Sequence, residues 1–149
     1  MENIKIFKID KKNLFWDKLI IFAKKCSWNV GKHLAKMMIN SDFSDWESVF
    51  IATSNEDIVG FCTFLKTDYY PDNRYSPWIS SIFVNESHRG NKISEKMINH
   101  VICYAKQIGF TKVYISSDIT GLYEKYGFLK IDELVNYSGD SDNIFMKII

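Results

Sequence analysis

The chain has 149 residues, of which 46% are hydrophobic and 25% are charged, and its formal net charge is +1. These values are typical of one globular domain with a hydrophobic core, and they exclude a disordered or collagen-like chain. A net charge near zero produces no field that attracts nucleic acid or an anionic membrane. We therefore expect a single domain over residues 1–149, with no nucleic-acid or membrane partner.

The cysteines and the N-terminal residues predict the compartment and the absence of a metal site. Cys26, Cys62 and Cys103 have none of the spacings typical of a metal site or a redox motif, so we expect no metal cofactor. Residues 1–12 lack the apolar core of a signal peptide, and no apolar run approaches the ~20 residues of a membrane-spanning helix. The sequence therefore predicts a cytoplasmic protein.

The first half of the chain predicts a strand, two helices and a β-hairpin from its apolar spacing and its turn residues. The expected elements are a strand at 3–9, a helix that opens at Asp10, a second helix after Ser27 or Asn29, and strands at 46–53 and 57–66 joined by the turn 54–57. Residues 67–77 contain both prolines and predict a loop.

The second half predicts a strand–helix–strand unit followed by a short helix and two strands. The expected elements are a strand at 78–84, a helix at 93–108 that ends before Gly109, a strand at 113–115, a short helix at 119–126, and strands at 128–134 and 144–148. One helix joins the first two of these strands, so they are expected to be parallel with a right-handed crossover. Together with the antiparallel hairpin, this order predicts an α/β fold with a mixed, mostly antiparallel sheet and helices on both faces.

The turn between strand 78–84 and the long helix has the composition of an anion site. Residues 85–94 read Asn-Glu-Ser-His-Arg-Gly-Asn-Lys-Ile-Ser. Unpaired backbone N–H groups and the dipole at a helix start bind anions such as a pyrophosphate. Gly90 permits a tight backbone, Asn91 tolerates a left-handed conformation, and Arg89 and Lys92 can add charge-assisted bonds. The alternative is a plain turn with solvated basic side chains.

Two segments resemble motifs of the GNAT superfamily of N-acetyltransferases. Arg89 matches the first position of the acetyl-CoA motif Arg/Gln-x-x-Gly-x-Gly/Ala, while Lys92 stands where a glycine is usual and Ser94 where a second small residue is usual. The segment 121–128, Gly-Leu-Tyr-Glu-Lys-Tyr-Gly-Phe, resembles the family's (Leu/Phe)-Tyr-x-Lys-x-Gly-Phe segment. The resemblance covers residues 78–132, and the first half of the chain shares only the general order of elements.

The resemblance implies a fold with a splayed pair of parallel strands, between which the pantetheine arm of acetyl-CoA lies. Backbone groups of the first splayed strand would bind the arm, and the following turn would hold the pyrophosphate. The implied cofactor-binding residues are Ile82, Phe83, Val84, Arg89, Gly90, Asn91, Lys92, Ile93, Ser94 and Tyr123. The backbone N–H near Val84 would stabilise the oxyanion.

The resemblance places Tyr123 at the family position of the general acid. A thiol has a reference pKa of about 8.5 and tyrosine of about 10, so a neutral tyrosine can donate to the departing sulfur. The alternative reading for Tyr123 is a core aromatic residue, and this is the reading we favour for Tyr126.

The sequence does not identify the general base, because many relatives carry a carboxylate on the strand that here offers Ser80 and Ser81. The candidate carboxylates, which would also make an acidic rim suited to a cationic amine, are Asp68, Asp72, Glu133, Asp140 and Asp142. The candidate apolar walls are Trp16, Trp28, Tyr69 and Tyr70. Asp118 is expected to cap the short helix. The acceptor is expected between the N-terminal helices, the loop 67–77 and the turn before the last strand.

These observations predict a monomeric or homodimeric N-acetyltransferase that moves an acetyl group from acetyl-CoA to a primary amine. A polyamine, an amino acid, an antibiotic and a protein lysine all remain possible acceptors. One alternative is a non-catalytic acetyl-CoA-binding sensor or interaction module on the same fold, which the missing base and Lys92 favour. The other is a nucleic-acid or protein interaction domain, and the near-neutral charge counts against nucleic acid.

Overall fold

The structure is a computed structural model that describes residues 3–149. Its elements in chain order are β1 (Ile4–Ile9), α1 (Phe15–Lys25), α2 (Asn29–Asn40), β2 (Ser48–Ser54), β3 (Asp57–Leu65), β4 (Trp78–Val84), the 3-10 turn η1 (Glu86–His88), α3 (Ile93–Gln107), β5 (Lys112–Ser117), α4 (Leu122–Lys125), β6 (Leu129–Val135) and β7 (Ser141–Ile148). Each expected strand and helix is present, with shifted ends.

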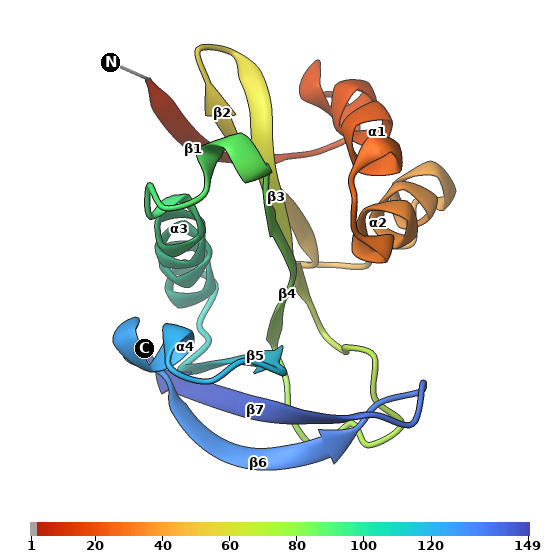
Figure 1. The fold of residues 1–149 in the computed structure, drawn as a ribbon. Coiled ribbons are helices and arrows are strands. Elements are labelled where there is room, and N and C mark those ends of the chain that lie inside the picture. The colour runs from red at the N-terminus through yellow and green to blue at the C-terminus, as the bar shows by residue number, and fades with distance from the viewer. Residues whose placement is uncertain (1–2) are drawn as a thin grey trace.

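The seven strands form one sheet in the order β1-β2-β3-β4-β5-β7-β6. Every neighbouring pair is antiparallel except β4 and β5, which are parallel. Helices α1 and α2 cover one face of the sheet and α3 covers the other (Figure 1). The predicted fold class, a mixed and mostly antiparallel sheet with helices on both faces, is confirmed.

The parallel strands β4 and β5 separate soon after they begin. Their ladder contains a single residue pair, Trp78 with Tyr114, and the Tyr114 N–H donates to the Pro77 carbonyl at 3.0 Å. Beyond this pair the two strands diverge toward their carboxyl ends (Figure 1). The predicted splayed pair is therefore present, and the divergence leaves inner backbone groups of β4 without a strand partner on that side.

On its other side β4 pairs with β3, and the register shifts between Phe61 and Thr63. Ser81 lies at this irregularity with a left-handed φ of 54°. An extra residue in one strand re-aims the side chains and backbone groups that follow it. The bulge thus sets which groups of β4 face the opening between β4 and β5.

Two large hydrophobic clusters hold the helices against the sheet. On one face α3 buries a stripe at helical spacing, Ile93, Met97, Val101 and Ala105, against β2, β3 and β5. On the other face α1 and α2 pack with Ile51, Phe61 and Phe83. These clusters fix the start of α3 relative to β4.

Of two predictions about helix ends, one is confirmed and one is wrong. Gly109 has φ of 101°, and the Phe110 N–H donates to the Ala105 carbonyl at 3.0 Å, so α3 ends as expected. Asp118 does not cap α4, because the helix begins only at Leu122. The Gly121 N–H there donates to Glu124 Oε1 at 3.0 Å instead.

Within residues 3–149 no helix has both the length and the apolar character needed to cross a bilayer.

Candidate active site

A cavity of about 1280 Å³ opens where β4 and β5 diverge. Its walls come from α2, β4, the turn before α3, the end of β5 and α4. The expected cofactor-site residues that line it are Ile82, Val84, Arg89, Gly90, Lys92, Ile93, Ser94 and Tyr123. The fold therefore brings both sequence motifs to one cavity.

Two of the expected cofactor-site side chains lie elsewhere. Phe83 points to the α1–α2 face, where its ring stacks on Phe61 at 5.3 Å between centroids and meets Trp28 at 5.2 Å. Side chains alternate along a strand, so the neighbours of Phe83 rather than Phe83 itself line the cavity. The Asn91 side chain donates from Nδ2 to the His88 carbonyl at 3.3 Å. For both residues, backbone contact with a cofactor stays a prediction.

The turn before α3 contains two left-handed residues. Gly90 has φ of 85° and Lys92 has φ of 58°, so the left-handed residue is Lys92 and not Asn91 as expected. Lys92 is the N-cap of α3, and no side chain in the described chain caps this end. The first amides of α3 lack helical partners, and together with the dipole they make this end attractive to an anion.

Arg89 braces the turn against β4 and α2. Its Nε donates to the Val84 carbonyl at 2.9 Å. Its guanidinium carbon lies 5.1 Å from the Trp28 ring and 5.7 Å from the Phe83 ring. Arg89 is an exposed residue, but its side chain is held by one hydrogen bond and by contacts with two aromatic rings.

Tyr123 occupies the buried end of the cavity on α4. Its residue is 9% exposed, and its ring packs against Phe145 at 5.9 Å and Phe128 at 6.3 Å between centroids. Burial raises the pKa of Tyr123 to about 12, and the neighbouring Tyr126 and Cys62 add to the shift. The hydroxyl therefore keeps its proton at neutral pH and is available as a hydrogen-bond donor.

Tyr126 also lines the cavity, although its spacing favoured a core role. It packs against the α3-side cluster, and its hydroxyl lies 3.3 Å from Ser94 Oγ at the start of α3. This pair links the two sequence motifs directly. The contact arises because the fold brings α4 beside the head of α3, and nothing in the sequence pattern predicts it.

Asp68, in the loop after β3, is a partly buried carboxylate of the cavity wall. Its Oδ1 accepts from the Tyr69 N–H at 2.8 Å and its Oδ2 accepts from Ser116 Oγ at 3.3 Å. Burial raises the pKa of Asp68 above its usual range, and the negative charge of Asp142 adds to the rise. Asp142 itself accepts from the Tyr70 hydroxyl at 2.8 Å.

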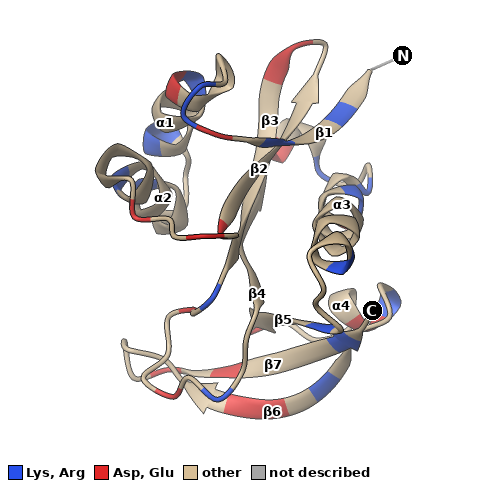
Figure 2. Cartoon of the chain, turned by 180° about the vertical axis from the view of Figure 1, so that it is seen from behind, with Lys and Arg blue, Asp and Glu red and all other residues tan. Residues whose placement is uncertain are grey.

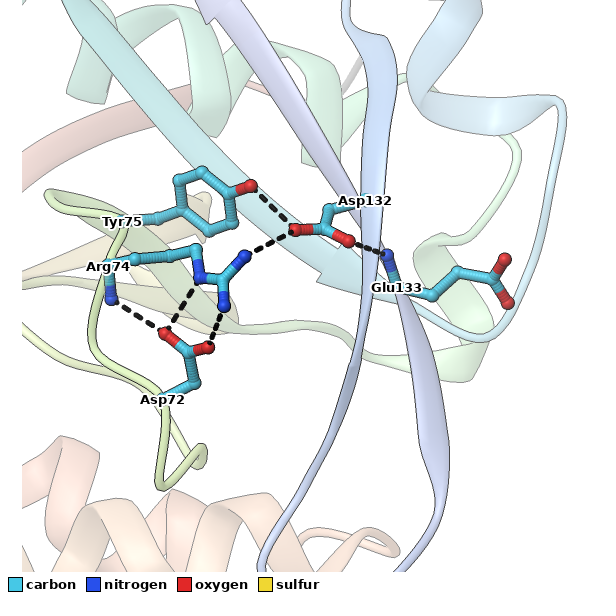
Figure 3. A network of polar contacts seen from close by, with 5 residues as sticks. All are labelled: Asp72, Arg74, Tyr75, Asp132 and Glu133. Atoms are coloured by element: carbon cyan, nitrogen blue, oxygen red, sulfur yellow. Dashed lines mark hydrogen bonds and ion pairs between the residues drawn. The ribbon is translucent and has the colours of Figure 1, made fainter.

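The other carboxylates expected at the acceptor rim lie outside the set of described residues that line the cavity. Asp72 forms an ion pair with Arg74 at 2.7 Å, and Tyr75 donates to Asp132 at 2.6 Å, in a network that joins the loop to β6 (Figure 3). The hydrogen bonds of Arg74 lower the pKa of Asp72, which makes it a weak base.

Three carboxylates that the sequence did not single out for the acceptor rim line the cavity instead: Asp42, Glu47 and Asp118. Acidic segments follow α2 in the view of Figure 2. Glu47 is held in place, because its Oε2 accepts from the Lys66 N–H at 2.9 Å. An acidic side of the cavity is therefore present, but only Asp68 of the five expected carboxylates contributes to its described lining.

Of the four aromatic residues expected to form apolar walls, two line the cavity and two do not. Trp28 and Tyr69 line the cavity, whereas Trp16 and Tyr70 are buried in hydrophobic clusters. Tyr69 meets Tyr137 at 5.3 Å between ring centroids, and its hydroxyl lies 3.2 Å from Ser138 Oγ. The loop after β3 and the turn before β7 thus form one wall of the cavity together, and binding of the acceptor against this wall stays a prediction.

Comparison with known proteins identifies the family. Residues 14–128 match the Acetyltransferase (GNAT) family. N-acetyltransferase family 8 member 2 of Rattus norvegicus is 25% identical over 133 residues, which cover 84% of this chain and 56% of the relative. The chain thus spans just over half the length of that relative.

Solved structures of low identity share the fold. A GNAT family acetyltransferase from Elizabethkingia anophelis with acetyl-CoA bound has a TM-score of 0.69 at 19% identity, with 99% of each chain covered. A chimera containing the spermidine N-acetyltransferase of Vibrio cholerae has a TM-score of 0.69 at 13% identity, with 97% of this chain and 95% of the other covered.

The family match spans most of the chain and includes the turn before α3 as well as Tyr123 and its helix. The structure adds the splayed parallel strands and the cavity between them. The resemblance seen in the two motifs is confirmed, and the chain belongs to the acetyltransferase (GNAT) family.

Proposed function

We propose that this protein transfers the acetyl group of acetyl-CoA to the primary amine of a small cationic acceptor, with Tyr123 as the general acid. The observation that carries the proposal is the cavity whose lining includes the head of α3, the inner side of β4 and Tyr123. A diphosphate, a pantetheine arm and a thioester need these three features in this order.

The cofactor would enter along the splayed strands. The amides at the head of α3 and the nearby Arg89 and Lys92 supply donors and positive charge for the diphosphate. The β4 backbone from Ile82 to Val84, freed from β5, would bind the pantetheine amides as a neighbouring strand would. Main-chain donors there would also stabilise the oxyanion.

The chemistry requires a proton at the departing sulfur. The amine nitrogen attacks the thioester carbon, a C–N bond forms, and the C–S bond breaks with its electrons on sulfur. The pKa of Tyr123 is about 12, and that of a thiol is about 8.5. A tyrosinate would take that proton back from a thiol, so Tyr123 is proposed to act as a relay that gives its proton to sulfur while it receives the one that the new amide nitrogen loses.

The acceptor would bind on the other side of the thioester, against α2, Tyr69 and Tyr137. The carboxylates of this wall, Asp42, Glu47, Asp68 and Asp118, favour a cationic molecule. The fold relative that acts on spermidine is one protein with such an acceptor. The cavity's partly apolar walls suit a small molecule with an alkyl or ring portion.

A thiol-release assay with acetyl-CoA tests the proposal. The purified chain is offered spermidine, an aminoglycoside, free lysine and a lysine-containing peptide, and the products are identified by mass spectrometry. Acetylated spermidine or aminoglycoside is the expected product. Binding of acetyl-CoA without turnover of any of the four would instead support a non-catalytic acetyl-CoA-binding module.

A further inference from the structure

Asp68 stands at the junction of three parts of the cavity wall. It belongs to the loop after β3, and its carboxylate receives the Ser116 hydroxyl from β5 at 3.3 Å and the Tyr69 N–H at 2.8 Å. Ser80 of the bulged strand β4 is its third neighbour. The side chain is therefore held at the mouth of the splayed strands, where both oxygens are fixed by donors.

Ser80 gives a second and independent sign of a ligand at this place. It is 6% exposed and lines the cavity. Within residues 3–149 its Oγ completes no hydrogen bond of ordinary geometry, although it lies near enough to Asp68 to help lower the carboxyl pKa. Leaving a buried hydroxyl without a partner is unfavourable, so a water molecule or the amine of the acetyl acceptor is its natural partner.

The groups around Asp68 act on its pKa in both directions, and the net effect is a rise. Asp142 on β7 is the charged group that acts on it, and Tyr70 in its own loop connects the two, since the Tyr70 hydroxyl donates to Asp142 at 2.8 Å. Burial and the negative charge of Asp142 raise the pKa of Asp68, while the serine hydroxyls of β4 and β5 lower it. Because the pKa of Asp68 is raised, it differs less from the pKa of an alkyl ammonium, which is about 10.4.

We propose that Asp68 is the general base of the reaction and that Asp142, which is hydrogen-bonded to Tyr70 of the same loop, is a positioning residue. This inference rests on the proposed acetyl transfer. The acceptor arrives as an ammonium ion and gives one proton to the Asp68 carboxylate, directly or through a water molecule on Ser80. The neutral amine attacks the thioester, and its second proton reaches the thiolate through Tyr123. The acid form of Asp68 then releases its proton to solvent, so the products are the amide, free CoA and one proton.

Asp72 is a matched control, because it lies in the same loop but outside the described cavity lining and pairs with Arg74. With spermidine as acceptor, Asp68→Asn is expected to lower kcat/KM about 100-fold or more. Asp72→Asn is expected to leave it within about two-fold, since an exposed ion pair contributes little. Both variants are expected to bind acetyl-CoA with unchanged affinity. Equal activity of Asp68→Asn and the wild-type protein would overturn the inference.

The pH profile separates a base from a purely structural residue. The wild-type kcat/KM is expected to fall on the acid side as Asp68 is protonated. Asp142→Asn removes the neighbouring charge, so this acid limb is expected to move to lower pH, and a limb that stays in place would contradict the role of Asp142. Carbon-13 NMR titration of the Asp68 carboxyl gives the same answer without turnover. A wild-type protein that acetylates none of the four amines refutes the proposed function and the base together, whereas turnover that survives Asp68→Asn refutes the base alone.

Discussion

The guanidinium of Arg89 lies 5.1 Å from the ring of Trp28. This contact joins the turn that precedes α3 to the start of α2, because Trp28 is the residue immediately before that helix. Trp28 also meets Phe83 of β4 at 5.2 Å between ring centroids. The expected diphosphate site and the expected acceptor side therefore share one side chain, and the N-terminal helices contribute to the order of the cofactor turn.

Trp28→Ala is expected to weaken acetyl-CoA binding. A cation–π contact at an exposed site is worth about 0.5–1 kcal/mol, so the dissociation constant is expected to rise about two- to five-fold. Isothermal titration measures this change, and Trp28→Phe, which keeps an aromatic face, is the control. An unchanged affinity in Trp28→Ala would show that the Nε bond to the Val84 carbonyl alone fixes Arg89.

Lys92 combines a left-handed backbone with a positive charge, and two substitutions separate these properties. Lys92→Gly removes the unfavourable φ and is expected to raise the free energy of unfolding by about 1 kcal/mol. Lys92→Ala keeps the φ and is expected to change stability much less. Both variants lose the ammonium and are expected to bind acetyl-CoA several-fold more weakly. Equal melting temperatures of the two variants would contradict the backbone argument.

Tyr123→Phe is expected to lower kcat about 100-fold, which is the usual effect of losing a general acid. The ring remains packed against Phe128 and Phe145, so acetyl-CoA affinity and melting temperature are expected to change little. Tyr126→Phe is the matched control on the same helix, since it removes a hydroxyl that contacts Ser94. Equal losses in the two variants would show that neither hydroxyl acts specifically on the sulfur.

Two acidic residues of one loop are expected to change stability with pH in opposite directions. Burial raises the pKa of Asp68, so the folded state holds its proton more tightly, and the stability contributed by this group is lost as pH rises through its folded pKa. Asp68→Asn is therefore expected to raise the melting temperature at pH 7 and to lose this advantage near pH 4. Hydrogen bonds from Arg74 lower the pKa of Asp72, so Asp72→Asn is expected to be less stable at pH 7. Calorimetry at both pH values measures each difference.

Local patterns in the sequence predicted the elements and their direction. The stripe of α3 and the glycine after it define the crossover, and the crossover makes β4 and β5 parallel. β7 lies between β5 and β6 because it pairs with an edge of each strand. The sequence pattern does not indicate which edges are available for this pairing. The bulge at Ser81 is equally hidden, because its left-handed residue is a serine and not a glycine.

The parts of the candidate site that consist of contiguous motifs could be predicted from the sequence. The parts that the fold assembles from distant segments could not. The turn from Arg89 to Ser94 and Tyr123 were named from short motifs, and most of these residues line the cavity. Of the acidic wall only Asp68 was named from the sequence as a rim residue, and Glu47 was not, since the two come from separate loops that only the tertiary structure brings to one cavity. Asp72 has the same sequence character as Asp68, but in the structure it lies outside the described cavity lining and pairs with Arg74.

A crystal structure of the protein with acetyl-CoA tests the central claim most directly. The diphosphate is expected to lie against the amides between Arg89 and Ser94, and the thioester sulfur is expected within hydrogen-bonding distance of the Tyr123 hydroxyl. A diphosphate bound away from the head of α3, or a sulfur atom remote from Tyr123, would contradict the account.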